Sequence, residues 1–341
     1  MKKIKMLSLF SGIGAPETAI KNLGFDLDVL NYCEIDKFAS TSYSAIHNED
    51  ESKNLKDVRD VDGKDYKDVD ILFHGSPCQS FSIVGKQDGG DQGSGTASSL
   101  MWETVRIVKD SLPKIVIWEN VKAVLNQKHK HNFDLYIQTL EELGYQSSHK
   151  LISPRDVGEA QSRPRVFVVS TLNGKFEFPE FKKQHIKTID KYLEDNVSEE
   201  YIVPEKIVNT LAYGNPNFNG RMTILRPTDY AGCLVAKSGR AARTNNFVLY
   251  NNNDYIHMEN PKDIRYLMDN DIPIRNLTPL EYWRLQNFSD EAFHAAQNAL
   301  AIKYKKGVIE NTEAQLYKQA GNSINITVLE SFIGEVLDNH V

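Results

Sequence analysis

The chain has 341 residues, which is more than one hydrophobic core needs, so we expect one large domain and a smaller one. It is 40% hydrophobic and 25% charged, as globular proteins are, and it lacks an apolar run of the roughly 18 residues that a transmembrane helix needs. The formal net charge of −6 excludes a uniformly basic protein that coats nucleic acid, but it leaves room for a local basic cleft.

The N-terminal residues and the cysteines indicate a compartment. Met1–Met6 is basic and leads into a strand-like run, without the apolar core of a signal peptide. Cys33, Cys78 and Cys233 cannot all pair with one another, and their spacing matches no zinc site. We therefore expect a protein of the reducing cytoplasm, with no membrane anchor and no metal.

The first predicted elements are a strand, a glycine turn and a helix. Met6–Phe10 is a short apolar run, Ser11–Gly14 supplies two glycines, and Pro16–Leu23 has helical spacing with proline near its start. A second strand, Leu27–Cys33, ends at Glu34, where nucleotide sites hold an acid for ribose hydroxyls. The turn lacks the third glycine of the dinucleotide pattern, which favours a smaller adenosine ligand over NAD. A purely structural turn fits these residues equally well.

Cys78 lies where a predicted strand ends and a loop begins. Asp70–Phe73 has the composition of a strand, and Gly75–Ser82 reads Gly-Ser-Pro-Cys-Gln-Ser-Phe-Ser. Pro77 fixes its own φ angle and favours an extended Ser76, so we expect the cysteine on a rigid corner at the carboxyl end of a strand. A thiol held there is a candidate nucleophile. The alternative is a small buried side chain, which is the commoner role of a single cysteine.

Strands and helices continue to alternate up to residue 170. The expected elements are a helix at Leu100–Asp110, a strand at Lys114–Trp118 that leads into Glu119-Asn-Val121, a helix at Phe133–Leu143 that ends at Gly144, and a strand at Arg165–Ser170. This rhythm predicts a doubly wound, mostly parallel sheet.

The alternation stops after Gly174, and residues 175–275 differ in composition. Between positions 206 and 250 one acid, Asp229, stands against six basic residues, which are Lys206, Arg221, Arg226, Lys237, Arg240 and Arg243. In an acidic protein such an insert indicates a surface for a polyanion, although a solvated face has a similar composition.

Regular structure is expected again towards the C-terminus. Leu277–Gln286 should be a helix in which Thr278 is the N-cap and Glu281 completes a capping box. Residues 290–316 are polar and predict a connector, whereas Val328–Leu337 predicts an amphipathic closing helix.

Six stretches, in this order, resemble the motifs of the cytosine-C5 DNA methyltransferase family. They are Phe10–Gly14, Gly75–Gln79, Glu119–Val121, Gln161–Arg165, Arg275–Phe288 and Gly321–Ser323. Each motif is modest alone, but six in the family order with suitable gaps form a strong signal. The resemblance covers the chain except residues 175–270, and Asn287 stands where the family usually has glycine.

The resemblance implies a Rossmann-like, doubly wound α/β fold of the class I methyltransferase type, with a smaller, irregular target-recognition domain. We expect a catalytic and cofactor-binding domain at 1–174, a target-recognition domain at 175–275, a hinge or connector at 276–316 and a returning segment at 317–341. The implied activity is that of a DNA (cytosine-5-)-methyltransferase of the bacterial or phage restriction-modification type.

The resemblance also assigns the catalytic residues. Cys78 is the implied nucleophile, because a thiolate that adds to carbon 6 of cytosine makes carbon 5 enamine-like. Glu119 is implied to protonate or hydrogen-bond ring nitrogen 3, a role that needs a raised pKa. Arg163 and Arg165 alternate along an extended segment and should share a face. Arg165 would hold the base carbonyl and the glutamate, and Arg163 would support the site; both would favour the thiolate.

The implied methyl donor is S-adenosyl-L-methionine, with S-adenosyl-L-homocysteine as the product. By resemblance, Phe10, Gly12 and Gly14 line the methionine end, Asn322 and Ser323 close it, Glu34 takes the ribose hydroxyls, Ile35 flanks the adenine, and Asp57 and Val58 meet its amino edge. Asp60 is a rival to Asp57 for the last role.

The implied partner is double-stranded DNA, and the target base must be flipped out of the duplex to reach the pocket. The segment 85–99 would close over that base. The residues expected to contact the DNA are Gln79, Ser82, Arg240 and Arg243, and Cys233-Leu234 is the best match to a Thr-Leu pair of the family. We expect a monomer, with a cognate restriction endonuclease as a candidate genetic partner.

Three other functions stay open. A methyltransferase of the same chemistry could act on transfer RNA, although the long basic insert favours sequence reading on DNA. A catalytically inactive DNA-binding regulator is disfavoured by the presence of Cys78, Glu119 and Arg165 together. A nucleotide-binding oxidoreductase is disfavoured by the missing third glycine.

Overall fold

The computed structural model describes residues 3–77, 91, 93–182, 184–213, 223–236, 246–250, 264–304 and 309–341. The chain divides into two compact units, which are treated separately below. Unit 1 consists of Met1–Ser153, Pro164–Lys182 and Ile326–Val341, and unit 2 consists of Pro154–Arg163 and Lys183–Asn325. Among the described residues, no helix is both long enough and apolar enough to cross a bilayer.

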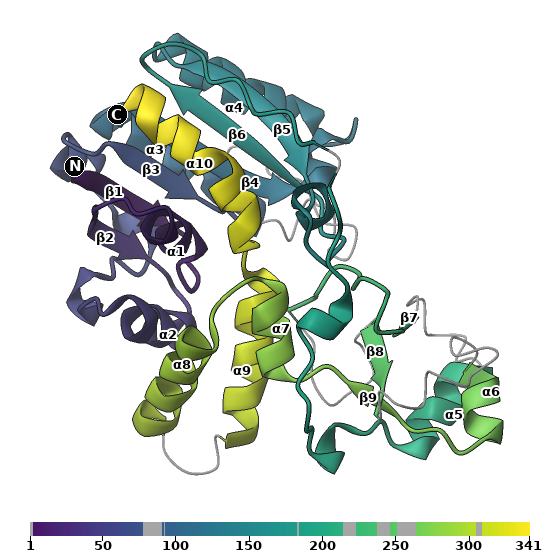
Figure 1. Ribbon diagram of the computed structural model, residues 1–341. Helices are drawn as coiled ribbons and strands as arrows, with labels where there is room; N and C mark the ends of the chain where they lie inside the picture. The colour runs from purple at the N-terminus through teal and green to yellow at the C-terminus, as the bar shows by residue number, and fades with distance from the viewer. Residues whose placement is uncertain are drawn as a thin grey trace. The chain divides into compact units, whose positions relative to one another are not determined.

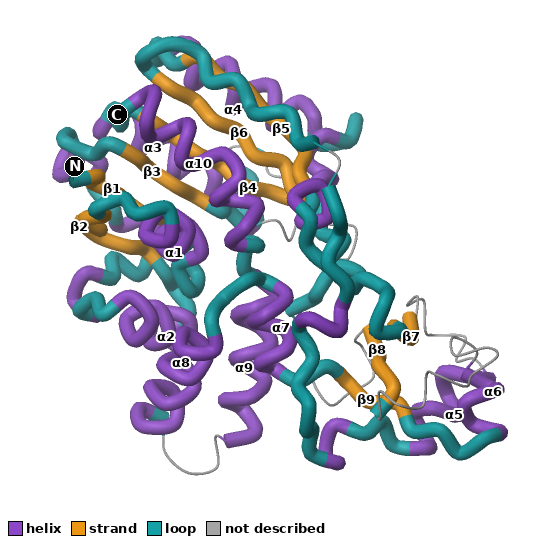
Figure 2. The backbone as a smooth tube through the Cα atoms, viewed as in Figure 1, coloured by secondary structure: helices purple, strands orange, loops and turns teal. Residues whose placement is uncertain are grey.

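Unit 1 is built on a six-stranded sheet (Figures 1 and 2). In spatial order its strands are β2 (Leu27–Cys33), β1 (Ile4–Leu9), β3 (Ile71–His74), β4 (Ile115–Val121), β6 (Arg165–Thr171) and β5 (Gln146–Ile152). The pairs β1–β2, β1–β3 and β3–β4 are parallel, whereas β6 runs antiparallel to both β4 and β5. The mostly parallel sheet expected from the sequence is confirmed.

Helices cover both faces of this sheet (Figure 1). They are α1 (Ala15–Asn22), α2 (Lys37–His47), α3 (Met101–Ser111), α4 (Lys130–Glu142) and α10 (Ile326–His340). Trp118 and Val168 lie in the core that the sheet shares with α3 and α4. The neighbouring Phe167 points to the opposite face, because side chains alternate along a strand, and its ring centroid lies 5.3 Å from that of Phe332 in α10. This arrangement is the doubly wound architecture.

The sequence missed two elements of unit 1. The strand β5 is a polar edge strand without an apolar run, and only its pairing with β6 defines it. The helix α2 begins at the N-cap Asp36, whose side chain accepts hydrogen bonds from the amides of Phe38 and Ala39. The expected strand at Lys114–Trp118 continues to Val121, so Glu119 lies within β4 rather than after it.

Unit 2 contains a small three-stranded sheet and five α-helices among its described residues. The strands are β7 (Thr223–Leu225), β8 (Asn246–Leu249) and β9 (Ile274–Asn276). The helices are α5 (Glu205–Tyr213), α6 (Ile264–Asp269), α7 (Pro279–Leu285), α8 (Asp290–Lys303) and α9 (Ile309–Asn322). Helix α7 carries the predicted capping box, because the Thr278 hydroxyl and the Glu281 amide interact while the Glu281 carboxylate accepts from the Thr278 amide.

The polar connector predicted for residues 290–316 is wrong, because α8 and much of α9 occupy this range. Helix α8 buries Phe293, Ala296 and Leu300, which share one face at helical spacing, and its remaining residues are mostly polar. Because this apolar stripe is narrow, the sequence of α8 resembles that of a polar loop. The departure at Asn287 also has a structural reason, because its φ of +65° is left-handed and asparagine tolerates that region better than most residues.

Candidate active site

The turn after β3 is attached to β4 by two hydrogen bonds. Trp118 Nε1 donates to Ser76 Oγ over 3.0 Å, and Asn120 Nδ2 donates to the Ser76 carbonyl over 3.2 Å. Ser76, Trp118 and Asn120 are all buried, so these bonds are shielded from water. The segment that leads to Cys78 therefore starts from a fixed position. Cys78 itself, with Gln79 and Ser82, lies outside the described residues.

Glu119 and Arg165 form an ion pair beside this turn. Arg165 Nε lies 3.1 Å from Glu119 Oε1, and each side chain is 14% exposed. A Cβ atom added to Gly75 would lie 3.5 Å from Glu119 Oε2, so the carboxylate faces the end of β3. Glu119 lies near the carboxyl end of β4 and Arg165 begins the antiparallel strand β6, so the pair presents an acid and a cation together at the edge where the parallel strands β3 and β4 end. This is where open α/β sheets bind ligands.

Arg163 makes a different set of contacts, all within unit 2. Its guanidinium is buried and donates to the carbonyl oxygens of Leu234 (2.8 Å), Gly321 (2.7 Å) and Ser323 (2.9 Å). Arg165 instead binds Glu119 and the Pro164 carbonyl. The two arginines therefore have different partners, and their shared face beside the thiol stays a prediction, because Cys78 lies outside the described residues. Arg163 holds main chain together, because both of its terminal guanidinium nitrogens donate to carbonyl oxygens.

The glycine turn after β1 and the acid after β2 meet in the structure. The Gly12 amide donates to Glu34 Oε2 over 2.9 Å, and the Asp36 amide donates to Glu34 Oε1 over 2.8 Å. Phe10 and Gly12 both have left-handed φ angles, +55° and +57°, which turn the chain sharply at the end of β1. A Cβ atom added to Gly12 would meet nothing within 4 Å, so open space lies next to this turn.

The other unit 1 residues predicted for the cofactor differ in exposure. Ile35 is 72% exposed, which is unusual for a large apolar side chain, whereas Val58 is buried. Asp57 pairs with the Arg59 guanidinium, and the hydrogen bonds from Arg59 lower the pKa of the Asp57 carboxyl. Its rival Asp60 is exposed at the end of the same short turn.

The last two predicted cofactor residues belong to unit 2. Asn322 ends α9, and the Ser323 carbonyl accepts the bond from Arg163. Within unit 1 the structure thus brings together the glycine turn and Glu34. That Asn322 and Ser323 close the same site stays a prediction.

Two residues near the glycine turn were missed by sequence reasoning. The His47 ring, buried in α2, hydrogen-bonds through Nε2 to the Ile13 carbonyl over 3.0 Å, and burial lowers the pKa of His47 to about 4. A Cβ atom added to Gly14 would lie only 2.0 Å from His47 Nε2, so the turn rests directly on the imidazole. Asn54 binds the main chain of Glu34. A single histidine or asparagine has no distinguishing local pattern, so the sequence held no signal for either.

In the recognition region, Arg240 and Arg243 lie outside the described residues. Leu234 is buried, and Arg163 donates to Cys233 Sγ over 3.4 Å. A Cβ atom added to Gly321 would lie 2.6 Å from the Ala236 amide nitrogen, so α9 touches this segment with its backbone. Cys233–Ala236 is therefore held firmly within unit 2.

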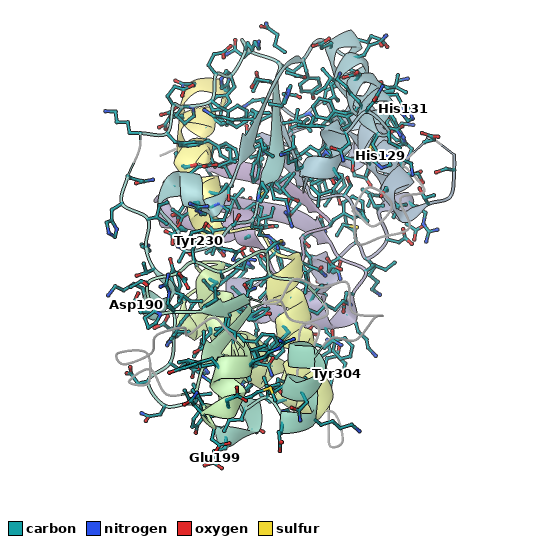
Figure 3. All side chains as sticks on the ribbon, turned by 90° about the vertical axis from the view of Figure 1, so that its right-hand side faces the viewer. His129, His131, Asp190, Glu199, Tyr230 and Tyr304 are labelled. Carbon is teal, nitrogen blue, oxygen red and sulfur yellow. The ribbon has the colours of Figure 1, made fainter. Side chains whose placement is uncertain are left out.

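An exposed aromatic ring lies close to the Cys233–Ala236 segment in sequence. Tyr230, labelled in Figure 3, is 42% exposed and carries the Arg155 guanidinium 3.8 Å from its ring centroid. Such a stacked pair is a cation–π contact.

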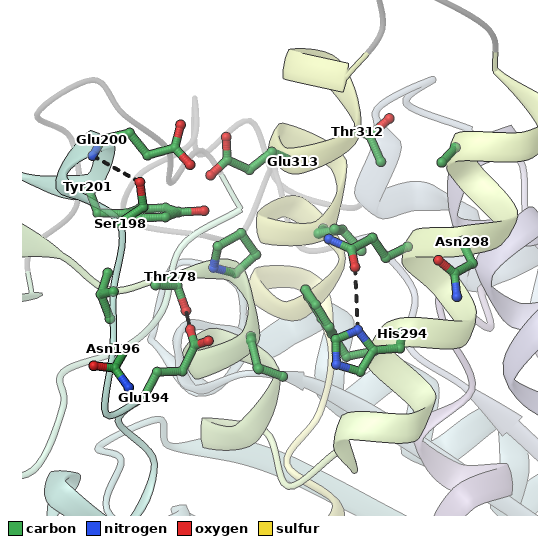
Figure 4. Close-up of a pocket in the computed structure, with 17 residues that line it drawn as sticks. Glu194, Asn196, Ser198, Glu200, Tyr201, Thr278, His294, Asn298, Thr312 and Glu313 are labelled. Atoms are coloured by element: carbon green, nitrogen blue, oxygen red, sulfur yellow. Dashed lines mark hydrogen bonds between the residues drawn. The ribbon is translucent and has the colours of Figure 1, made fainter.

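Unit 2 also contains a cavity of about 660 Å³ (Figure 4). Residues 194–201 and helices α7, α8 and α9 line it, with Glu194, Glu200, Glu313 and His294 among the polar groups. The Thr278 hydroxyl binds the Glu194 carboxylate, and His294 Nδ1 lies 3.4 Å from Gln297 Oε1 (Figure 4). The lining includes none of the residues predicted for catalysis, cofactor or DNA.

Solved structures share the fold. The Dnmt2 methyltransferase of S. pombe superposes with a TM-score of 0.76 at 20% sequence identity, covering 98% of each chain. The methyltransferase EhMeth of Entamoeba histolytica gives a TM-score of 0.70 at 19% identity, covering 99% of each chain. At these identities the likeness concerns the fold alone.

Curated relatives and a family model are more specific. A type II methyltransferase of Lactococcus lactis subsp. cremoris is 33% identical over 286 residues, which are 84% of this chain and 71% of that protein. An orphan methyltransferase of Bacillus phage SPR is 27% identical over an alignment covering 100% of this chain and 99% of that protein. The model of the C-5 cytosine-specific DNA methylases matches residues 4–338. With the strand-end acid and the glycine turn in place, the chain belongs to the C-5 cytosine-specific DNA methylase family, whose methyl donor is S-adenosyl-L-methionine.

Proposed function

We propose that this enzyme methylates carbon 5 of a cytosine flipped out of duplex DNA, through a temporary covalent bond to Cys78. The observation that carries the proposal is the Glu119–Arg165 pair, with 3.1 Å between Arg165 Nε and Glu119 Oε1. The second carboxylate oxygen faces Gly75, three positions before the cysteine. An acid and a cation are thus held at the strand ends from which the nucleophile segment leaves the sheet.

The chemistry follows from these groups. The thiolate of Cys78 adds to carbon 6, and the electron pair of the 5,6 double bond moves into the 4,5 bond. The pair of the 3,4 double bond moves onto ring nitrogen 3, which takes a proton from Glu119. Carbon 5 is now enamine-like, and the pair of the 4,5 bond forms the bond to the methyl group, whose former sulfur partner would leave as S-adenosyl-L-homocysteine. Nitrogen 3 returns its proton to Glu119 as the 3,4 double bond re-forms. A base then removes the proton from carbon 5, and the electron pair re-forms the 5,6 bond and expels the thiolate. Arg165 Nε, 3.1 Å from Glu119 Oε1, keeps the Glu119 carboxyl group oriented towards the base.

The residues around the glycine turn fit an adenosyl cofactor. Glu34 offers a carboxylate for the ribose hydroxyls, and it is already oriented by the Gly12 and Asp36 amides. Exposed Ile35 offers an apolar surface for the adenine, and the open space at Gly12 leaves room for the methionine end. S-adenosyl-L-methionine supplies the methyl group as an electrophile on its sulfonium.

The remaining cofactor contacts are proposed from the motifs. They are Phe10, Gly14, Asp57, Val58, Asn322 and Ser323. Asp57 is engaged by Arg59, so this proposal requires the adenine amino group to compete with an exposed guanidinium.

Duplex DNA is the proposed substrate, and residues 175–275 are its proposed reader. The charged residues between positions 206 and 250 are mostly basic. Arg240 and Arg243 there follow small residues, which would let the main chain enter a groove of the DNA. Residues 1–174 with the C-terminal segment 317–341 are the proposed catalytic part. We also propose a monomer that acts in the cytoplasm, with or without a cognate endonuclease.

Transfer RNA is the competing substrate. The structural likeness to solved methyltransferases concerns the fold alone, so it does not decide between DNA and RNA. The test is transfer of a labelled methyl group to duplex DNA and, in parallel, to transfer RNA. We expect label in DNA alone, and bisulfite sequencing of DNA from cells that express the enzyme should then locate one recognition site. Label in transfer RNA alone would contradict the proposal, and label in neither would favour an inactive DNA-binding protein.

A further inference from the structure

The side-chain amide of Asn54 uses its full hydrogen-bonding capacity next to Glu34. Its Oδ1 accepts from the Glu34 amide over 3.0 Å and from the Lys56 amide over 2.8 Å. Its Nδ2 donates to the Glu34 carbonyl over 2.9 Å and to Ser40 Oγ over 2.8 Å. Two donated and two accepted bonds are all that an asparagine amide can make. Asn54 thus binds both main-chain groups of Glu34, as a neighbouring strand would.

Other contacts couple the same two segments. The Leu55 amide donates to the Tyr32 carbonyl over 2.8 Å, and Cys33 Sγ donates to the Lys56 carbonyl over 3.3 Å. Burial raises the pKa of Cys33 to about 12, so the thiol keeps the proton that it donates. The segment 54–56 therefore runs beside the end of β2, and its pairing extends past Cys33 to Glu34.

Asn54 also determines where the chain goes next. Lys56 has a left-handed φ of +62°, which an ordinary side chain adopts only when its surroundings require it. The bond from the Lys56 amide to Asn54 Oδ1 stabilises this turn, and Asp57 and Val58 follow immediately. One amide therefore sets both the position of Glu34 and the direction of the chain that enters Asp57.

We propose that Asn54 is a positioning residue for the adenosine half of the cofactor, because it fixes the spacing between Glu34-Ile35 and Asp57-Val58. This inference rests on the proposed placement of the cofactor at these four residues. Asn54 acts through the main chain of Glu34 and touches neither the transferred methyl group nor the base. Its loss should weaken cofactor binding and leave the chemical step almost unchanged.

The experiment compares Asn54→Ala with Asn31→Ala. Asn31 lies in the adjoining strand β2, donates to the Lys53 carbonyl over 2.9 Å and accepts from the Tyr66 hydroxyl over 3.1 Å. It is a matched control, because its side-chain amide also links β2 to the chain around residue 54. Its partner there is the Lys53 carbonyl, so it does not touch Glu34. The probe is S-adenosyl-L-homocysteine, titrated by calorimetry, and kcat is measured on DNA at saturating S-adenosyl-L-methionine.

We expect Asn54→Ala to weaken S-adenosyl-L-homocysteine binding by roughly tenfold or more, the effect of one or two lost hydrogen bonds that orient a charged group. The KM for S-adenosyl-L-methionine should rise in proportion, while kcat changes by less than about twofold. Asn31→Ala should bind within about threefold of the wild type even if its melting temperature falls equally. If Asn54→Ala does not fold, Asn54→Asp replaces it, because it keeps both accepted bonds and loses both donated ones; the same tenfold loss is expected.

A Glu34→Ala variant distinguishes a failure of the positioning role of Asn54 from a failure of the proposed cofactor site. If Glu34→Ala loses affinity but Asn54→Ala and Asn54→Asp bind like the wild type, the positioning role is wrong and the cofactor site stands. If Glu34→Ala itself binds normally, the proposed cofactor placement fails and this inference fails with it. A fall in kcat without a change in affinity would also overturn the positioning role.

Discussion

Gly12 and Gly14 lie in one turn and share a left-handed conformation, with φ angles of +57° and +78°. Their surroundings are opposite. A Cβ atom at Gly12 meets nothing within 4 Å, whereas a Cβ atom at Gly14 lies 2.0 Å from His47 Nε2 and 2.7 Å from its Cδ2. Alanine at the two positions should therefore affect different properties of the enzyme.

The magnitudes follow from this geometry. A non-glycine residue in the left-handed region costs about 1 kcal/mol, and both variants bear that cost. Gly14→Ala must in addition displace a buried imidazole that holds the Ile13 carbonyl, and overpacking of this kind costs roughly 1–3 kcal/mol more. We expect Gly14→Ala to lower the free energy of unfolding by about 2–4 kcal/mol and Gly12→Ala by about 1 kcal/mol.

Cofactor affinity should rank the two variants in the reverse order. The Gly12 methyl group enters the open space that we assign to the cofactor, so Gly12→Ala should weaken S-adenosyl-L-homocysteine binding by about tenfold or more at a small cost in stability. Urea unfolding measures the first quantity and calorimetric titration the second.

A double-mutant cycle with His47→Ala tests the cause. Removing the ring should abolish the extra cost of Gly14→Ala, which gives a coupling free energy of roughly 1–3 kcal/mol. Equal destabilisation by the two glycine variants, or a coupling near zero, would refute the reasoning that the imidazole supports the turn.

The remaining predictions concern the chemistry, the DNA and the pH. Cys78→Ser should abolish methylation and keep cofactor and DNA binding, because a hydroxyl is a weaker nucleophile than a thiolate. The wild-type enzyme should form an SDS-stable adduct with DNA that carries 5-fluorocytosine. Substantial activity in the serine variant would exclude the covalent route. Glu119→Gln should slow single-turnover methylation by about 10²–10⁴-fold with little change in cofactor affinity, and an unchanged rate would remove its acid role. Arg240→Ala should cost about 1–3 kcal/mol and relax one base position in a site library, whereas Lys206→Ala should weaken all sites alike and lower the salt slope by about one. Burial lowers the pKa of His74 to about 3, so protonation favours the unfolded chain below about pH 6.5, and the contribution of His74 to stability should fall by about 2 kcal/mol from pH 7 to pH 5. In urea unfolding His74→Gln should reduce the pH dependence by that amount and leave the similar contribution of His47 in place.

Local signals determined much of this protein. The apolar runs at 27–33 and 71–73, the capping box at Thr278 and the glycine turn after β1 each depend on residues a few positions apart, so the sequence predicts them directly. The parallel sheet followed from the rhythm of these elements, and the order of the motifs indicated the family.

Tertiary contacts decided the rest. The polar strand β5 exists because β6 pairs with it, and α8 has only a narrow apolar stripe that packing makes visible. Local alternation relates Arg163 to Arg165, but it does not indicate that the Arg163 guanidinium binds carbonyls up to 160 positions away. Asn54 supports Glu34 across 20 positions, and His47 supports the glycine turn across 34 positions. A polar side chain is selected by the unpaired main-chain groups that folding brings next to it, and no local pattern in the sequence records which groups those are.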